Sequence, residues 1–98
     1  MHPDKVRRER LQKLTDLPNI GPAGAKDLQL LGIHQPGQLR GQSALAMYRQ
    51  LCLLSGQKHD PCVLDVFMSV VSFMEGGEPQ PWWAFTAERQ RLLKADAP

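Results

Sequence analysis

Apolar residues recur along this chain at the three- and four-residue spacing that places side chains on one face of an α-helix. Near the start of the chain, spacings of four, four and three residues separate Val6, Arg10, Leu14 and Leu17, and this stripe predicts a first helix over residues 4–16. Pro18 should end that helix, because proline disfavours helical geometry at the residue before it.

A second helix is predicted to begin at Pro22 and to end at Gly32. Proline suits the first position of a helix, where its missing N–H would have no acceptor. Glycine readily adopts the left-handed conformation that closes a helix, and Ile33 is placed to make the apolar contact that accompanies such a cap. A single helical turn is expected at residues 38–40.

The second half of the chain predicts three more helices, over residues 43–56, 60–76 and 86–93. Each opens at a serine, aspartate or threonine, the residue types that cap helix N-termini, and the first two close at glycines. The middle segment has the most continuous apolar stripe and is expected to be the most buried. Its valines also suit a β-strand, but its length and its capping residues favour a helix. Residues 78–81, with two prolines, should be extended.

The length and the composition fit one small globular domain. The chain has 98 residues, of which 42% are apolar and 22% are charged, and a chain of this size can bury one modest core. The predicted fold is therefore all-α, a compact bundle of about five helices in a single domain over residues 1–98. A disordered tail is expected from about residue 95.

Positive charge is concentrated at the start of the chain. Residues 1–13 contain five lysines and arginines and two acids, a net charge of +3, whereas the whole chain carries only +2. A basic helix that faces solvent and a basic surface that faces phosphate groups both fit this pattern, and both interpretations stay open.

Residues 17–22 form the most informative segment, a predicted hairpin between two short helices. Asn19 and Gly21 are residue types that tolerate a positive φ, so the turn can be tight. Ile20 can point inward and hold the turn to the core. Gly24 has no side chain, so the preceding helix can approach closely.

The helix that follows this hairpin has an N-terminus with the chemistry of a phosphate site. Backbone N–H groups there have no partner within the helix, and the helix dipole adds a partial positive charge. Lys26, one turn further along, can reach a neighbouring phosphate, and contacts of this kind do not depend on base sequence. The predicted DNA phosphate-binding residues are Asn19, Gly21, Ala23, Gly24 and Lys26, with Arg7 and Arg8 of the first helix beside them.

The hairpin resembles that of the helix-hairpin-helix superfamily, whose pattern is apolar-Pro-Gly-apolar-Gly-Pro followed three residues later by alanine. Asn19 takes the place of the first glycine, and Ala23 stands where a lysine is common, which removes one phosphate contact. The residues that match the pattern are Leu17, Pro18, Ile20, Gly21, Pro22 and Ala25. The resemblance implies a DNA-binding hairpin.

Residues 10–93 also resemble a wider family, the small bacterial proteins described as pathogenicity-locus or mitomycin-resistance-related. Asp60-Pro61-Cys62 and Pro81-Trp82-Trp83 carry much of this resemblance. It implies a fold of the DNA-binding type, with DNA repair or damage tolerance as the expected setting.

Other candidate chemistry is weaker. Cys52, His59 and Cys62 lack the paired spacing that is typical of zinc ligands, so neither a metal nor a cofactor is predicted. No nucleophile stands in an evident pairing with a base, which argues against an enzyme. Asp65 is expected to bond a backbone N–H or an arginine such as Arg89, because burying it unpaired would be costly.

Three side chains have two interpretations each. Trp82 and Trp83 are expected to cover the core, with stacking on unpaired bases as the alternative. Cys62, in the first turn of a helix, is expected to be a packed thiol, with a reactive thiolate as the alternative.

The cellular setting is expected to be the cytoplasm. The chain shows neither a signal-peptide pattern nor an apolar run that could span a membrane, so reduced cysteines without a Cys52–Cys62 disulfide are expected. The sequence as a whole predicts a non-enzymatic domain that binds the DNA phosphate backbone without sequence specificity. A degenerate helix-hairpin-helix that binds another protein is the alternative.

Overall fold

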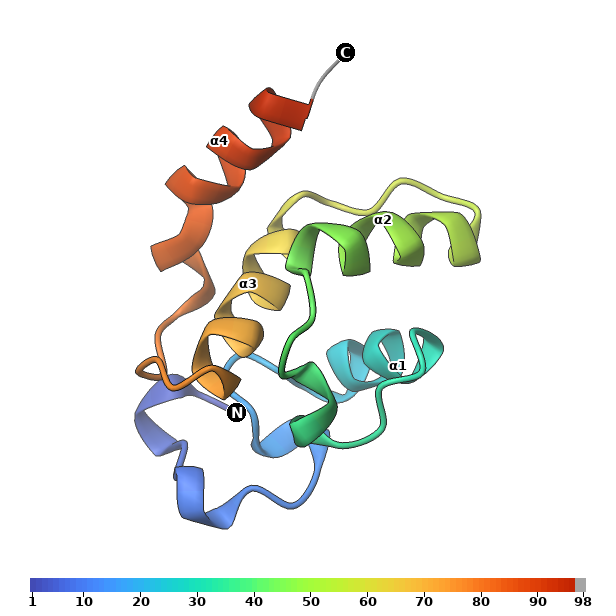
Figure 1. Ribbon diagram of the computed structural model, residues 1–98. Coiled ribbons are helices and arrows are strands. Elements are labelled where there is room, and N and C mark those ends of the chain that lie inside the picture. Colours follow the sequence, from blue (N-terminus) through green and yellow to red (C-terminus); the bar gives the residue numbers. More distant parts are fainter. Residues whose placement is uncertain (97–98) are drawn as a thin grey trace.

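Four α-helices make up most of the regular structure. The computed structural model describes residues 1–96, and within that range it contains no β-strand, which confirms the all-α fold class. The helices are α1 (Pro22–Leu30), α2 (Ala44–Ser55), α3 (Cys62–Met74) and α4 (Thr86–Asp96) (Figure 1).

The predicted first helix, over residues 4–16, is wrong. The N-terminal arm, as we call residues 1–16, contains three separate 3₁₀ turns joined by extended residues, at Pro3–Lys5 (η1), Arg8–Arg10 (η2) and Leu14–Asp16 (η3). The Asp16 carboxylate provides a physical reason, because its Oδ2 accepts the N–H groups of both Gln12 and Lys13. A helix through this segment would need those N–H groups for its own ladder.

Helix α1 begins at Pro22 as predicted and is closed by Gly32, which has a φ of +83°. The N–H of Ile33 returns to the carbonyl oxygen of Leu28 at 2.9 Å, the long bond of a Schellman cap. Ile33 and Leu28 are both buried, so the cap also fixes the chain to the core. A short 3₁₀ turn follows, η4 (Pro36–Leu39), close to the turn predicted at 38–40.

Helices α2 and α3 agree closely with the predicted ranges. The Ser43 hydroxyl accepts the N–H of Ala46 at 3.2 Å and so caps α2, and Gly56 closes the helix directly after Ser55. At the start of α3, the Asp60 carboxylate accepts the N–H of Cys62 at 2.8 Å. The prediction of a helix rather than a strand in this valine-rich segment is confirmed.

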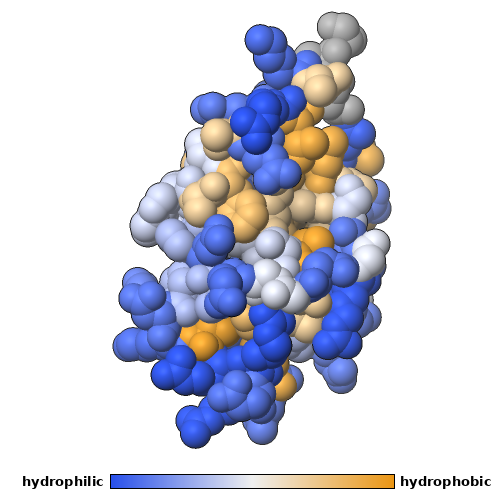
Figure 2. Space-filling view, turned by 60° about the vertical axis from the view of Figure 1, so that its left-hand side comes forward, coloured by the Kyte–Doolittle hydropathy of each residue, from blue (hydrophilic) through white to orange (hydrophobic). Residues whose placement is uncertain are grey.

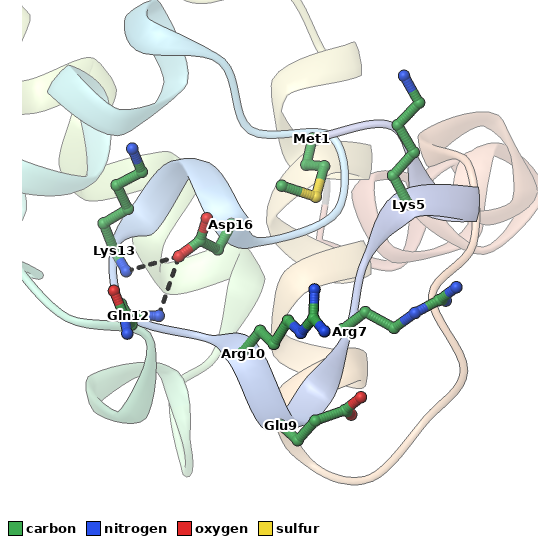
Figure 3. Close-up of a pocket in the computed structure, with 8 residues that line it drawn as sticks. All are labelled: Met1, Lys5, Arg7, Glu9, Arg10, Gln12, Lys13 and Asp16. Carbon is green, nitrogen blue, oxygen red and sulfur yellow. Dashed lines mark hydrogen bonds between the residues drawn. The ribbon is translucent and has the colours of Figure 1, made fainter.

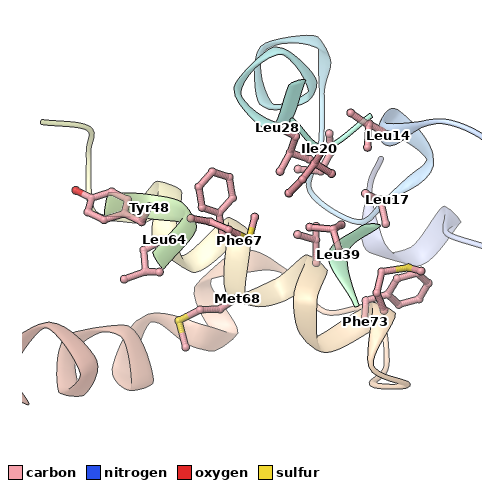
Figure 4. Close-up of a cluster of buried hydrophobic side chains, with 14 of the residues drawn as sticks. Leu14, Leu17, Ile20, Leu28, Leu39, Tyr48, Leu64, Phe67, Met68 and Phe73 are labelled. Atoms are coloured by element: carbon pink, nitrogen blue, oxygen red, sulfur yellow. The ribbon is translucent and has the colours of Figure 1, made fainter. Parts of the chain in front are cut away.

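Helix α3 is the centre of the core. It contributes more buried residues than any other element within residues 1–96, and it packs against α2, α4, η4 and η5 (Trp82–Phe85). Figure 4 shows side chains from the turn before α1 and from η4 lying along it. The fully buried members of this core include Leu17, Ile20, Leu28, Leu39, Leu51, Leu64, Phe67, Val70 and Phe73.

The last helix is fixed to α3 by a buried carboxylate. Asp65 accepts a hydrogen bond of 2.8 Å from the Nε of Arg89 and one of 2.6 Å from the hydroxyl of Thr86. The expectation that an arginine such as Arg89 pairs with Asp65 is confirmed. Thr86 is the first residue of α4, and its hydroxyl is used for this contact.

Helix α4 runs further than predicted. It continues to Asp96, so the disordered tail expected from about residue 95 is wrong for residues 95 and 96, and the rest of that tail lies outside the described residues. No helix among residues 1–96 is long and apolar enough to cross a membrane.

The pairing of Asp65 with Arg89 gives a stability prediction. Arg89→Ala leaves a fully buried carboxylate with one hydroxyl partner, so we expect the free energy of unfolding to fall by about 3 kcal/mol. Arg91→Ala, which removes an exposed arginine from the same helix, is the control and should change stability by less than about 0.5 kcal/mol. Equal effects of the two substitutions in urea unfolding would contradict this assignment.

Candidate functional site

The N-terminus of α1 offers three backbone N–H groups that have no acceptor anywhere in residues 1–96. They belong to Gly21, Ala23 and Gly24. The N–H of Ala25 is the first to be used, and it donates to the carbonyl oxygen of Gly21 at 2.9 Å. Gly21 and Ala23 are exposed, so these groups are open to an anion from solvent.

Lys26 lies on the same face of α1 as Ala23, because residues three apart on a helix are neighbours. Its side chain is exposed, and within the described part of the chain it has neither an ion pair nor a hydrogen bond. Side chains on a helix lean toward the helix N-terminus. The side chain of Lys26 is therefore expected to lean toward the end of α1 that carries the free N–H groups.

The turn before α1 depends on Asn19. Its φ is +67°, as predicted for a tight turn, and within residues 1–96 it is the single residue other than glycine with a positive φ. The expectation of a positive φ at Gly21 is wrong, because Gly21 has a φ of −100° and a ψ of −170°. A side chain at Gly21 would meet nothing within 4 Å, so Gly21→Val should not strain the turn.

Every N–H donor of Asn19 is used inside the protein. Its side-chain nitrogen donates to the Ser69 hydroxyl at 3.0 Å and to the Gln80 carbonyl oxygen at 2.8 Å. Its backbone N–H donates to the carbonyl oxygen of Met1 at 2.8 Å. Asn19 therefore shapes the turn and has no N–H left for a phosphate.

The carbonyl side of the turn is occupied by the amino group of Met1. The ammonium group donates to the carbonyl oxygens of Leu17 and Ile20 at 2.9 and 2.8 Å. Burial lowers the pKa of this amino group, and the nearby charge of Asp16 opposes that shift. The positive charge of Met1 thus lies against the turn.

A basic pocket of about 450 Å³ adjoins the turn (Figure 3). Its cations have no ion pair within residues 1–96, and Asp16, one of its two acids, is held by the backbone of Gln12 and Lys13. Those two N–H groups lower the pKa of Asp16. The pocket is lined by Met1, Lys5, Arg7, Glu9, Arg10, Gln12, Lys13 and Asp16.

Figure 2 shows many hydrophilic side chains at the lower end of the molecule, the end that the N-terminal arm occupies in Figure 1, and others at the upper end. Arg7, predicted to contact phosphate, is one of the exposed cations there. The basic stretch noted in the sequence therefore forms a surface, although it does so without the predicted helix.

Arg8, the other arginine predicted beside the phosphate site, is used as an anchor. Its Nη1 and Nη2 donate to the carbonyl oxygens of Phe73 and Gly77 at 2.6 and 2.7 Å. The guanidinium carbon also lies 4.0 Å from the centroid of the Phe73 ring. These contacts hold the N-terminal arm against the C-terminus of α3, where the helix dipole favours a cation. No local sequence signal indicates a contact across so many residues.

The two tryptophans differ in exposure. Trp82 is half-buried, as expected for a residue that covers the core, whereas Trp83 is 63% exposed, so that prediction is wrong for Trp83. The two indole rings meet edge to face, with centroids 5.4 Å apart and planes at 85°. They follow Gln80, whose carbonyl oxygen is bonded to Asn19.

The residues around the start of α3 form a separate cluster. The Ser55 hydroxyl lies 2.8 Å from Nε2 of His59, and the backbone N–H of His59 donates to the sulfur of Cys52. Both cysteines are free thiols, and among residues 1–96 no three histidine, cysteine or acidic side chains are arranged to hold a metal. A hydrogen bond to Asp60 raises the pKa of the Cys62 thiol, which gives no support to a reactive thiolate there.

Comparison with known proteins assigns the chain to a protein family. The family model described as "Pathogenicity locus" matches residues 7–91, which include the turn before α1 and both tryptophans. The chain belongs to this family.

A curated relative also supports membership of the pathogenicity locus family. The chain is 40% identical over 83 residues to the mitomycin resistance protein McrB of Streptomyces lavendulae, a match that covers 85% of this chain and 79% of that protein. The resemblance to the pathogenicity-locus or mitomycin-resistance-related proteins is therefore confirmed. No solved structure matches the chain.

The contacts of Arg8 in this pathogenicity locus protein predict that replacing it lowers stability, whereas replacing Arg7 does not. We expect Arg8→Ala to lower the free energy of unfolding by about 1.5 kcal/mol, because two charge-assisted hydrogen bonds to carbonyl oxygens are lost. Amide exchange in the N-terminal arm should accelerate. Arg7→Ala is the matched control and should leave stability and exchange nearly unchanged. An Arg8→Ala protein as stable as the Arg7→Ala protein would show that Arg8 is no anchor.

Proposed function

We propose that this protein is a non-enzymatic DNA-binding domain that holds the phosphate backbone at the N-terminus of α1. In this proposal residues 14–33 act as a helix-hairpin-helix whose first helix is reduced to the turn η3. The observation that carries the proposal is the set of free N–H groups at Gly21, Ala23 and Gly24, with Lys26 on the same face.

Backbone N–H groups bind phosphate oxygens but do not distinguish one base from another. A helix N-terminus adds a partial positive charge, and Lys26 adds a full one. We therefore expect binding without sequence specificity, with an affinity that depends strongly on salt because counterions are released. Asn19 and Arg8 are positioning residues in this account, because the side chain of each donates two hydrogen bonds within the protein.

The basic pocket extends the proposed surface beyond the helix N-terminus. Met1 lines the pocket, and its ammonium group bonds the turn, so the two features are adjacent. Lys5, Arg7, Arg10 and Lys13 would attract a polyanion that passes along the N-terminal arm. We place the function in DNA repair or damage tolerance, in keeping with the name of the Streptomyces relative, a mitomycin resistance protein.

Binding to another protein is the second candidate, and a different surface favours it. Leu53 and Leu54 on α2 are 76% and 50% exposed. Leu53 also lines a pocket of about 690 Å³ together with Tyr48 and Cys52. Exposed leucines beside a hollow are typical of protein contacts.

The proposal makes a quantitative prediction about salt. For duplex DNA, Lys26→Ala should reduce the slope of log K against log salt by about 0.9, because one phosphate loses its cation. The fold should be unaffected, since Lys26 has no partner within residues 1–96. Binding titrations at several salt concentrations measure this slope.

Lys58→Ala provides the control, because it removes an exposed lysine from the loop before α3. It should leave the slope unchanged. If the unaltered protein shows no salt-dependent association with single- or double-stranded DNA at low ionic strength, the phosphate-binding proposal fails and protein binding is favoured.

A further inference from the structure

Packing within the protein does not explain why the side chain of Trp83 is exposed. At 63% exposed, it is the largest side chain left open to solvent among residues 1–96. Its edge-to-face contact with Trp82 covers at most one face of the indole ring. Stacking of a flat, apolar group on an exposed tryptophan face is favourable, because it removes apolar surface from water.

The segment that leads to Trp83 is bonded to the turn that precedes the proposed phosphate site. Gln80 accepts the hydrogen bond from the Asn19 side chain, and Trp83 is three residues further along the chain. Three steps of about 3.8 Å between successive Cα atoms put Trp83 within about 11 Å of Gln80. The turn before the phosphate site and the tryptophan are thus linked by one hydrogen bond and three residues of chain, so a single DNA strand that lies at the turn can extend to the ring.

The segment is also rigid enough to present the ring. Pro79 and Pro81 restrict its backbone, and the N–H of Ala84 donates to the carbonyl oxygen of Pro81 at 3.0 Å. Thr86, directly after η5, is bonded to the buried carboxylate of Asp65. A platform that is already ordered loses little conformational entropy when a base stacks on it.

We propose that Trp83 is a stacking platform for an unpaired nucleobase, so that the protein prefers single-stranded DNA to duplex DNA. The inference rests on the proposed function, because it takes the strand to be held at α1. Bases within a duplex have both faces covered by their neighbours, and only an unpaired base can place its face on the indole. Since every base has such a face, the preference for single strands involves no sequence specificity.

The test uses the full chain with Trp82→Phe, which leaves Trp83 as the single tryptophan. Titration with a thymine-only oligonucleotide, which cannot pair with itself, should quench the fluorescence of Trp83 to saturation. A duplex of equal length at the same salt concentration should quench it less. Absence of quenching by the single strand would overturn the inference.

The DNA affinity of a Trp83→Ala variant provides a second test. Trp83→Ala should weaken single-strand binding at least fivefold, within the roughly 5- to 150-fold range for loss of one stacked base. Duplex affinity and its salt slope should stay unchanged. Because the side chain is largely exposed, the variant should fold, and circular dichroism checks this.

The outcomes separate this inference from the proposed function. Salt-dependent DNA binding that Trp83→Ala leaves intact on both DNA forms refutes the stacking platform alone, and favours a protein contact for Trp83. An equal loss on both forms refutes the preference for unpaired bases. An unaltered protein that binds no DNA refutes both proposals.

Discussion

The side chain of Asn19 joins the parts of the candidate site. One carboxamide nitrogen bonds Ser69 in the middle of α3 and Gln80 in the segment that leads to the tryptophans. The same residue adopts the left-handed conformation that turns the chain into α1. Asn19 therefore links the turn before α1, the core helix and the segment that leads to Trp83.

Helix α3 holds the turn, the N-terminal arm and α4 in place. Its buried side chains hold the turn, and its C-terminal carbonyl groups hold the N-terminal arm through Arg8. At its other end, Asp65 holds α4. Polar contacts at both ends and in the middle of one apolar helix thus add direction to the apolar packing of the three segments around it.

The sequence predicted the parts of the fold that local chemistry determines and missed those that distant contacts determine. Caps and apolar spacing located α2 and α3 because a helix depends on residues three or four positions apart. The N-terminal arm had helical spacing too, but Asp16 and the distant partners of Arg8 hold it in separate turns. For the candidate site, the positive φ of Asn19 could be predicted, whereas its bond to Gln80 and the exposure of Trp83 could not.

The central claim is that backbone N–H groups at the start of α1 hold phosphate, and NMR of the ¹⁵N-labelled protein tests it most directly. On titration with a short oligonucleotide, the account predicts that the amide signals of Gly21, Ala23 and Gly24 move most, since these N–H groups have no acceptor in residues 1–96. Shifts that leave these three amides unmoved and concentrate around Leu53 and Leu54 would contradict it.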